Sequence, residues 1–418
     1  MSFRKPIFFV VLLAFAGLFQ SCQDSCTREQ TFSSFTPVWM SLDEIRQDIV
    51  FDGPRDLVNP GKLYYYQNYL FINERGEGIH IFDNSNPAFP SPVSFIAIPG
   101  NEDIAIKENI LFANNYIDLI TIDITSPESP SFVKRSEEVF PAFSSIQDGQ
   151  ILVDYTEETV TMVTDCDEWG FFMNDVFRPA ANEASMMADM AAVGVGGTGV
   201  GGSMARFTIV EDYLYTVDDN NLNSFDISNL TDAMPASTVN IGWGIETVYP
   251  AQGHLFIGSS TGMFIYGLDN PAEPNFKGDF NHANACDPVV VKDNYAYVTL
   301  RSGTECEGFI NQMDVVNIEN LFNPFLEQTF AMHNPHGLSI SDNHLFLCEG
   351  DQGLKVFDIS DPLTLDERMI DHQTNLHGFD VLTLADNLVL VVGKDGLYQF
   401  DSSDPSDLKQ ISVIPVIK

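Results

Sequence analysis

Apolar and polar positions alternate in short runs along most of this chain. Runs of about five to seven residues, rich in β-branched and aromatic side chains, are separated by turns containing glycine, asparagine, aspartate or proline. Runs of this length and composition are typical of β-strands. One kind of run occurs seven times, as NYLFINE, NILFANN, DYLYTVD, GHLFIGS, NYAYVTL, NHLFLCE and DNLVLVV. The pattern therefore predicts an all-β fold built from a repeated unit.

A second run marks the same unit, with GIHIFDNSNP, DLITIDITSP, NLNSFDISNL, GLKVFDISDP and GLYQFDSSDP as its clearest copies. The copies align on the Asp of "FD" or the residue in its place, at Asp83, Asp123, Asp226, Gly267, Asn317, Asp358 and Asp401. Four of the six steps between these positions are 40 to 43 residues long. A period of this length, with four strand-like runs in each unit, indicates β-propeller blades rather than a helical solenoid.

Seven copies predict a seven-bladed β-propeller of four-stranded blades over residues 38–418. An eighth blade stays open, because residues 146–165 contain two more strand-like runs and Asp165 lies 42 residues after Asp123. This segment lacks the proline bend and the outer strand. It therefore favours a hairpin within an insertion over about residues 141–203.

The repeated Asp has a sufficient structural explanation. In "D-I-S-x-P" the Asp and Ser side chains can bond backbone N–H groups of the bend, while Pro restricts the turn. A catalytic Asp would be expected once, whereas this one occupies five of the seven positions. We therefore predict that Asp358 and its equivalents stabilise bends.

Net charge limits the classes of partner. The chain has 20 Lys and Arg against 59 Asp and Glu, a formal charge of −39. Nucleic acid requires basic residues that replace its counterions, so it is not an expected partner. Electrostatic attachment to an anionic membrane surface is disfavoured for the same reason. The acidic residues are spread along the chain, as in a solvated surface.

The first 21 residues are predicted to be a signal peptide rather than part of the fold. Arg4 and Lys5 precede an apolar run over residues 7–19, the order found in secretory signals. A helix over these 13 residues is too short to cross the roughly 30 Å hydrocarbon layer.

Cys22 directly follows the small residue Ser21, and this arrangement resembles a bacterial lipoprotein signal. Phe19 and Gln20 depart from that pattern, in which Leu and a small residue are usual. The resemblance implies lipidation of Cys22 and a flexible tether over residues 22–37, with ordinary secretion as the alternative. A lipid would attach the protein to a membrane without spanning it.

The repeat resembles that of the LVIVD-repeat proteins, whose strand motif is similar to LITID at residues 119–123. The chain also resembles a group of Bacteroidetes lipoproteins through NPGKLYYY, GGSMARFTIV, ACDPVVVKDNYAYVTLRSGT and NPHGLSI. This resemblance extends from about residue 37 to the C-terminus. It implies a propeller located in the cell envelope, with the outer membrane as the expected site, and it implies no particular activity.

Polar residues gather in the loops that lead into the innermost strand of each blade. These loops open on one face of a propeller, together with the loops between the second and third strands. Five of the eight His residues occur in them, at His282, His333, His336, His372 and His377. Asn101 and Asp103 occur in another. Convergent polar groups at a concave mouth are a reasonable binding site. The candidate ligand-binding residues are His282, Asp287, His336, His377, Arg206 and Trp243.

A structural role for the histidines stays open. In the "HG" pairs at His336 and His377, the imidazole could simply bond to a neighbouring blade. The His residues lack the i, i+4 spacing of a helical zinc site, and no metal or other cofactor is expected.

Three cysteines allow specific expectations. Cys286 precedes an inner strand and Cys306 follows the second strand of the same blade, so both are expected at the same face. An exported protein can hold a disulfide there, with two free thiols as the alternative. Cys348 lies inside a strand and is predicted to be a small buried apolar residue.

Two function classes remain. The favoured one is a non-catalytic binding or scaffolding module whose partner is an unknown protein, glycan or small molecule of the envelope. It is favoured because no nucleophile–base pair, metal motif or cofactor fingerprint stands out from the repeat. The alternative is a hydrolase or lyase acting on a glycan or peptide. His336 and His377 would then serve as acid and base, and Arg206 would contact an oxyanion or carboxylate.

Overall fold

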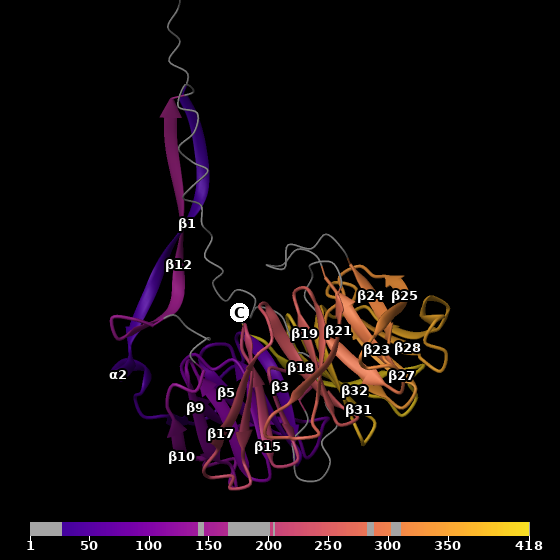
Figure 1. Cartoon of the computed structure of the whole chain (residues 1–418), viewed down its shortest axis with the longest axis horizontal. Coiled ribbons are helices and arrows are strands. Elements are labelled where there is room, and N and C mark those ends of the chain that lie inside the picture. The colour runs from indigo at the N-terminus through magenta and orange to yellow at the C-terminus, as the bar shows by residue number, and fades with distance from the viewer. Residues whose placement is uncertain are drawn as a thin grey trace, which may run out of the picture. The chain divides into compact units, whose positions relative to one another are not determined.

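The structure is a computed structural model that describes residues 27–140, 146–165, 201–203, 205–281, 288–301 and 311–417 (Figure 1). The chain divides into two compact units. The smaller consists of Met1–Val38 and Asp154–Ala181, and the larger of Trp39–Val153 and Asn182–Lys418. Within the described residues, no helix is both long enough and apolar enough to cross a membrane.

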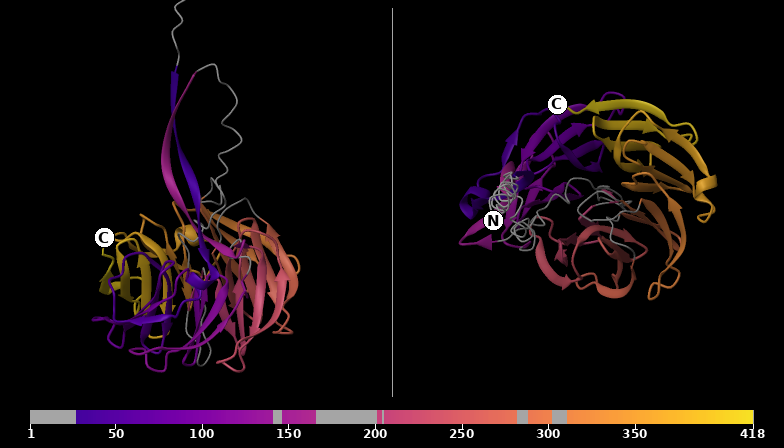
Figure 2. Two further views of the ribbon diagram at one scale, coloured as in Figure 1. Left: turned by 90° about the vertical axis from the view of Figure 1, so that its left-hand side faces the viewer. Right: turned by 90° about the horizontal axis from the view of Figure 1, so that it is seen from above.

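The larger unit is a seven-bladed β-propeller, which confirms the predicted fold. Its seven four-stranded antiparallel sheets follow one another around a ring, and the last lies beside the first (Figure 2, right). The strands of each blade are consecutive in the chain.

The blades have the following strands. Blade 1 contains β3 (Pro60–Tyr66), β4 (Tyr69–Glu74), β5 (Gly78–Asp83) and β6 (Ser91–Ala97), and blade 2 contains β7 (Ile104–Lys107), β8 (Ile110–Asn115), β9 (Asp118–Asp123) and β10 (Ser131–Ser136). Blade 3 contains β14 (Phe207–Val210), β15 (Tyr213–Val217), β16 (Asn221–Asp226) and β17 (Met234–Asn240), and blade 4 contains β18 (Ile245–Ala251), β19 (His254–Ser259), β20 (Gly262–Gly267) and β21 (Asn275–Asn281). Blade 5 contains β22 (Val289–Lys292), β23 (Tyr295–Leu300), β24 (Gln312–Asn317) and β25 (Phe325–Ala331). Blade 6 contains β26 (Leu338–Ser341), β27 (His344–Cys348), β28 (Leu354–Asp358), the 3₁₀-helix η4 (Leu365–Glu367) and β29 (Met369–Gln373). Blade 7 contains β30 (Gly378–Leu384), β31 (Leu388–Gly393), β32 (Gly396–Asp401) and β33 (Lys409–Pro415).

Two short elements precede blade 1. The helix α2 (Leu42–Ile45) begins at Ser41, whose hydroxyl accepts from the N–H of Glu44 while the Glu44 carboxylate accepts from the N–H of Ser41. This capping box stabilises the first turn. The strand β2 (Val50–Asp52) then pairs with the outer edge of β6 and gives blade 1 a fifth strand.

The segment that could have formed an eighth blade pairs elsewhere. The strands β11 (Ile146–Gln147) and β12 (Gln150–Asp165) form a three-stranded sheet with β1 (Thr27–Ser41). The predicted hairpin is therefore present, and the blade count is seven. The expected tether over residues 22–37 lies in β1 from Thr27 onward, because Thr, Phe and Val suit a strand once β12 supplies a partner. Within the smaller unit, the hydroxyls of Thr31 and Thr161 are 3.3 Å apart across this pairing.

The blade repeat acts through local hydrogen bonds, as predicted. The Asp358 carboxylate accepts from the N–H of Ser360 at 2.8 Å. The equivalent bond, 2.7 to 3.0 Å long, forms at the five other described copies that have Asp or Asn, namely Asp83, Asp123, Asp226, Asn317 and Asp401. Hydrogen bonds from the Ser360 side chain and backbone lower the pKa of Asp358, with Arg368 contributing further.

The proline bends also join neighbouring blades. The Ser94 hydroxyl on β6 donates to the carbonyl of Pro127 in blade 2 at 2.7 Å. Ser412 occupies the same place on β33 and donates to the carbonyl of Pro87 in blade 1 at 2.6 Å. The repeat therefore shapes a bend and presents its carbonyl to the next sheet.

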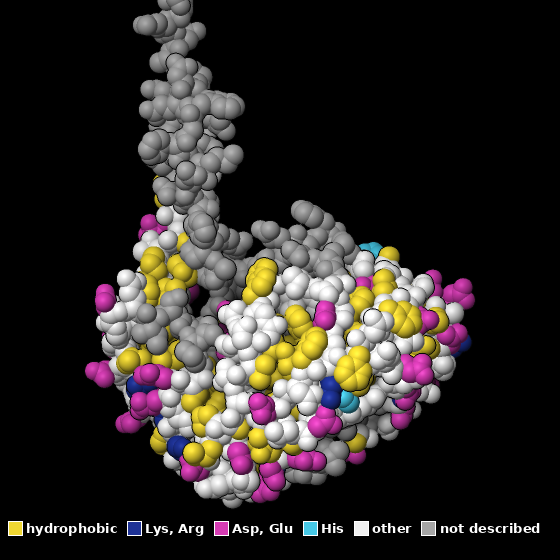
Figure 3. All heavy atoms as spheres, in the orientation of Figure 1, with side chains coloured by type: hydrophobic (Ala, Val, Ile, Leu, Met, Phe, Trp, Pro, Cys, Tyr) yellow, Lys and Arg dark blue, Asp and Glu magenta, His cyan; other side chains and the backbone are white. Residues whose placement is uncertain are grey.

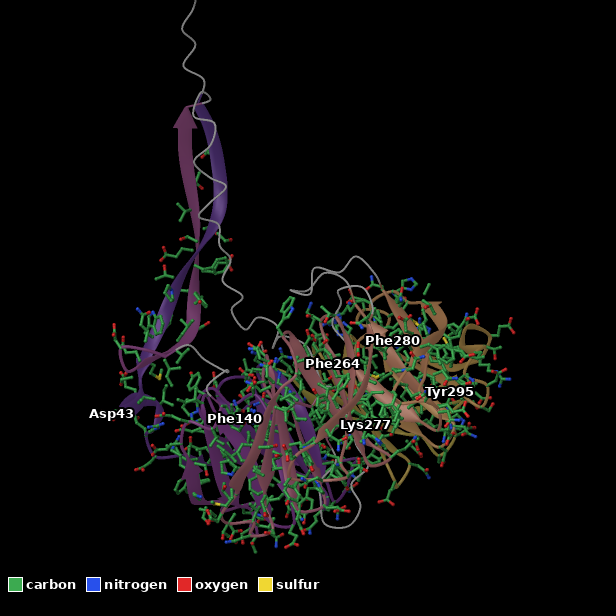
Figure 4. All side chains as sticks on the ribbon, viewed as in Figure 1. Asp43, Phe140, Phe264, Lys277, Phe280 and Tyr295 are labelled. Atoms are coloured by element: carbon green, nitrogen blue, oxygen red, sulfur yellow. The ribbon has the colours of Figure 1, made fainter. Side chains whose placement is uncertain are left out.

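Aromatic packing extends the core to the beginning of the insertion. Phe140 is fully buried and packs against Phe207 and Phe225 of blade 3, with ring centroids 5.6 and 5.8 Å apart (Figure 4). On the exterior, acidic side chains are scattered over the visible face and basic ones are few (Figure 3), as the charge distribution predicted.

The ring closes between blades 7 and 1 through side chains and single hydrogen bonds. Leu63 and Ile72 of blade 1 share an apolar cluster with Leu382 and Leu390 of blade 7. The buried amides of Asn84 and Gln399 exchange two hydrogen bonds of 3.0 and 2.8 Å across this seam. No described strand of blade 1 belongs to the sheet of blade 7.

Replacing Asp358 by Ala should lower the free energy of unfolding by about 1 kcal/mol, because the hydrogen bonds of the bend are lost. The pKa of Asp358 is lowered in the folded state, so its contribution is present above the ordinary Asp pKa of about 3.9 and is lost as the pH falls below it. Urea unfolding at pH 7 and pH 3 measures both effects. The exposed Asp366 of the same blade is the control, and equal losses in the two variants would contradict the proposed bond.

Candidate functional site

The pairing register aligns the seven inner strands and reveals a shared position at the channel mouth. The residues that pair with the fourth residue of the second strand are Leu63, Ile104, Phe207, Val248, Val289, Leu338 and Val381. One or two places before them, six blades have a described ionisable residue, namely Lys62, Asp103, Arg206, Glu246, His336 and Asp380. In blade 5 the sequence has Asp287 there, outside the described residues. The loops therefore bring chemically different groups to equivalent places around one opening.

Asp103 organises the side of the mouth formed by blades 1 to 3. Its carboxylate accepts from Lys62 Nζ at 2.9 Å and from the backbone N–H of Phe207 at 2.9 Å. The backbone N–H of Arg206 donates to the same oxygen. One buried carboxylate thus connects three blades and fixes the position of the Arg206 backbone.

Arg206 lies among carboxylates. Its Nη1 is 3.6 Å from Glu102 Oε2 and 3.8 Å from Asp219 Oδ1. Burial opposes the charge of Arg206, but Glu102 and Asp219 outweigh burial and raise its pKa. Burial raises the pKa of both Glu102 and Asp219, and Arg206 counteracts it. The neighbouring charges thus favour the charged form of Arg206 and partly offset the effect of burial on the two carboxylates.

A second cluster joins blades 5 to 7. Arg301 and His336 are only 5% and 3% exposed, and Arg301 Nη1 donates to His336 Nδ1. Burial is the main cause that holds the pKa of His336 well below its usual range, and Arg301 and His377 add to it. Burial lowers the pKa of Arg301 to about 10.

These contacts determine the tautomer of His336. Because Nδ1 accepts from Arg301, the proton of the neutral ring belongs on Nε2. The Asn334 amide nitrogen lies 3.1 Å from Nε2, and exchanging the nitrogen and oxygen of this amide would place an acceptor beside the Nε2 proton. His336 is a buried imidazole whose Nδ1 lone pair is occupied by Arg301, which does not suit a general base.

His377 lies next to His336, with ring centroids 6.5 Å apart. His377 Nδ1 bonds the carboxylate of Asp351 in blade 6. Both imidazoles of the "HG" pairs therefore bond to the preceding blade, which is the structural role left open from the sequence. Glu246 of blade 4 favours the charged form of both Arg206 and Arg301, and this electrostatic contact relates the two clusters.

Trp243 projects from the loop before β18 and is 67% exposed. It stands between Gly242 and Gly244, whose φ angles of 138° and 68° favour glycine. An added Cβ on Gly244 would also lie 2.2 Å from the Ser260 hydroxyl oxygen. The backbone therefore holds a large aromatic side chain out toward solvent.

The remaining histidines and cysteines predicted from the sequence lie outside these two clusters or outside the described residues. His333 is exposed and its backbone N–H donates to Glu349, while His372 bonds the carbonyl of Gln352 from within β29. Cys348 is a fully buried free thiol, as predicted. The remaining predictions lie outside the described residues and stay predictions, namely those for Cys22, His282, Cys286, Asp287 and Cys306.

Sequence reasoning missed several members of the mouth. Lys62 lies one place before its aligned inner-strand residue, as Arg206 does, and Glu246 lies two places before, as His336 does, so the strand alignment itself could have found them. Arg301 directly follows the NYAYVTL strand and could have been found from the equivalent loop. Its bond to His336 depends on the order of blades in the ring.

Metal binding has no support among the described residues. No group of three or more His, Cys, Asp or Glu within the described ranges is arranged to hold a metal ion. The mouth can instead offer paired charges, amides and an exposed indole to a polar partner.

Comparison with known proteins identifies the repeat. The LVIVD repeat matches residues 62–95, 201–240 and 335–368, which fall in blades 1, 3 and 6. This chain is an LVIVD repeat-containing β-propeller. No curated protein matches it.

A solved structure supports the fold of this LVIVD-repeat propeller. A functionally unknown protein from Desulfotomaculum acetoxidans has a TM-score of 0.52 and 15% identity, and the match covers 83% of this chain and 95% of that one. BamB from Moraxella catarrhalis has a TM-score of 0.47 and 9% identity, with 88% and 97% covered. Kluyveromyces lactis Hsv2 has a TM-score of 0.46 and 12% identity, with 84% and 98% covered. At such identities the likeness concerns the fold alone.

Replacing His336 by Gln should flatten the dependence of stability on pH below about 6.5. The pKa of His336 is lowered in the folded state, so the unfolded chain takes up a proton first and stability is lost as the pH falls. The wild type should lose up to about 1.4 kcal/mol per pH unit through this group. Gln cannot take up the proton, yet it can still accept from Arg301.

Chemical unfolding between pH 7 and pH 5 tests this expectation. The exposed His333 of the same loop provides the control as His333→Gln, which should retain the wild-type slope. A wild-type slope in His336→Gln would show that this imidazole is not held neutral.

Proposed function

We propose that this propeller is a non-catalytic binding or scaffolding module of the cell envelope that contacts its partner at the channel mouth. The observation that carries the proposal is the set of ionisable residues that six blades contribute one or two places before the aligned residue of the inner strand. The partner is a protein, a glycan or a small molecule. The alternative of a hydrolase or lyase is less favoured, because His336 is buried and the lone pair of its Nδ1 is occupied by Arg301.

Preorganised charge supports binding at this face. Arg206 is held by Glu102 and Asp219, and His377 is held by Asp351, so little side-chain freedom remains to be lost when a partner arrives. The Asp351 side chain is 87% exposed and therefore still reaches solvent. Charges arranged in this way favour specificity and rapid association.

The exposed indole supports the same face. Trp is enriched among the residues that contribute most to binding energy at interfaces. Trp243 lies in the loop that leads into β18. Glu246, at the channel mouth, is the second residue of that strand. A partner over the mouth can therefore meet an aromatic surface beside charged groups.

Attachment to the envelope rests on the amino-terminal sequence. The apolar run followed by Ser21 and Cys22 supports export and lipidation, with the outer membrane as the proposed location. A lipid on Cys22 would localise the propeller without requiring any contact between its acidic surface and anionic lipid.

Replacing Cys22 by Ser should move the protein from the membrane fraction to the soluble periplasmic fraction, because the acceptor thiol of the lipid is removed. Fractionation of cells expressing each form, followed by immunoblotting, measures the change. Ser21→Thr keeps the thiol and should remain in the membrane fraction. Membrane association that survives Cys22→Ser would disprove the anchor.

Replacing Trp243 by Ala should weaken partner capture about tenfold or more, since a central Trp contributes at least 1 to 2 kcal/mol at many interfaces. The measurement is quantitative affinity purification from envelope extract, with wild type and variant labelled differently. Phe89→Ala is a matched control, because Phe89 is 79% exposed and lies in a bend that leads away from the mouth. Equal losses in both variants, or none in Trp243→Ala, would reject binding at this face.

A further inference from the structure

The segment from Gly201 to Ala205 touches inner strands on different sides of the ring. The Ser203 hydroxyl oxygen accepts from the N–H of Leu338 in blade 6 at 3.1 Å. The carbonyl of Ala205 accepts from the N–H of Val248 in blade 4 at 2.8 Å. The segment runs into β14 of blade 3, and Leu338 lies three blades further round the ring, so the segment must lie within the central channel.

Blade 1 is the third contact. A Cβ added to Gly201 would lie 2.7 Å from the ring of Tyr64 on β3, so glycine permits the backbone to pass directly against this aromatic ring. Gly201, Gly202 and Ser203 are all buried. The N–H of Ala205 donates to the carbonyl of Gly202 at 3.1 Å, which makes the segment a compact turn.

The segment then continues directly into the Arg206 cluster. The backbone N–H groups of Arg206 and Phe207 donate to Asp103 of blade 2, and Phe207 begins the inner strand of blade 3. Residues 201–203 and 205–207 therefore contact blades 1, 2, 3, 4 and 6 from inside. This segment is named the channel strap.

Blade 7 lies between two of the blades that the strap holds. Its seam with blade 1 has no shared strand among the described residues. The seam includes the apolar cluster, the Asn84–Gln399 amide pair, the bond from Ser412 to Pro87 and a backbone hydrogen bond from Ile417 to Leu57. Opening of the ring at this seam would increase the separation of blades 6 and 1. Ser203 bonds blade 6 and Gly201 packs against Tyr64 of blade 1. Because these two residues are two positions apart in the chain, the strap limits how far the two blades can separate.

We propose that the channel strap keeps the ring closed at blade 7 and so acts as a conformational lock on the channel mouth. The lock concerns the propeller itself and does not depend on the identity of any partner. Release of the strap would allow blades 7 and 1 to separate. It would also loosen the backbone of Arg206, whose N–H bonds Asp103.

Amide hydrogen exchange of the full chain, followed by mass spectrometry, tests the lock. Ser203→Ala removes one oxygen and leaves the Leu338 N–H without its acceptor, and Gly201→Val places methyl groups against Tyr64. Both variants should accelerate exchange about tenfold in the strands of blade 7 and in β3, beyond the change at Leu338 itself.

Ser224→Ala is the matched control. Ser224 is a buried serine whose hydroxyl donates to the carbonyl of Ala272 at 2.8 Å and so joins blades 3 and 4 outside the channel. Its loss should accelerate exchange near those blades and leave blade 7 unchanged.

The lock is supported if blade 7 responds to the strap variants and not to Ser224→Ala. It is overturned if Ser203→Ala changes exchange only around Leu338, or if Ser224→Ala affects blade 7 equally. If Gly201→Val does not fold, as judged by circular dichroism, Ser203→Ala decides the question alone.

Discussion

Burial of each blade between its two neighbours is the constraint on which the rest of this structure depends. A four-stranded sheet has two faces, and here both are apolar over much of their length. All six residues of β8, and all six of β31, are buried. A single blade cannot cover both faces, so stability requires a closed ring in which each sheet covers the next. The repeated polar residues serve this packing, since the bend formed by Asp358 and its equivalents presents carbonyls to the neighbouring sheet.

Closure of the ring brings the first and last copies of the repeat together. Among the described residues the last blade meets the first without a shared strand, and the bond from Ser412 to Pro87 is one of the contacts between them. The Asn84 and Gln399 amides satisfy each other at this seam, where an unpaired buried amide would be costly. The strap enters from the insertion between blades 2 and 3. A segment without any blade pattern can therefore stabilise contacts between distant blades.

The loops at the mouth differ because the repeat leaves them unconstrained. Packing determines the apolar residues inside each strand, while different side chains occur one or two places before the aligned inner-strand residue. Lys62, Arg206 and His336 lie there in three blades and have different chemistry, Lys62 within β3 and the other two in the loops before their strands. Their side chains pair across blade boundaries, as in the ion pair of Arg206 with Glu102 and the hydrogen bond from Arg301 to His336. The mouth is thus both an interface between blades and a surface for a partner.

The sequence by itself determined the features that depend on neighbouring residues. The seven-bladed fold follows from runs that repeat every 40 to 43 residues, the role of Asp358 from a hydrogen bond that spans two residues, and the burial of Cys348 from the apolar strand around it. The tertiary structure alone decided which partners meet across blades. Arg301 and His336 are 35 residues apart, and Ser203 and Leu338 are 135 residues apart. Likewise, β1 becomes a strand only because β12 returns to it. Such pairs have no local signal, because their distance is determined by ring closure and by the path of the insertion rather than by spacing along the chain.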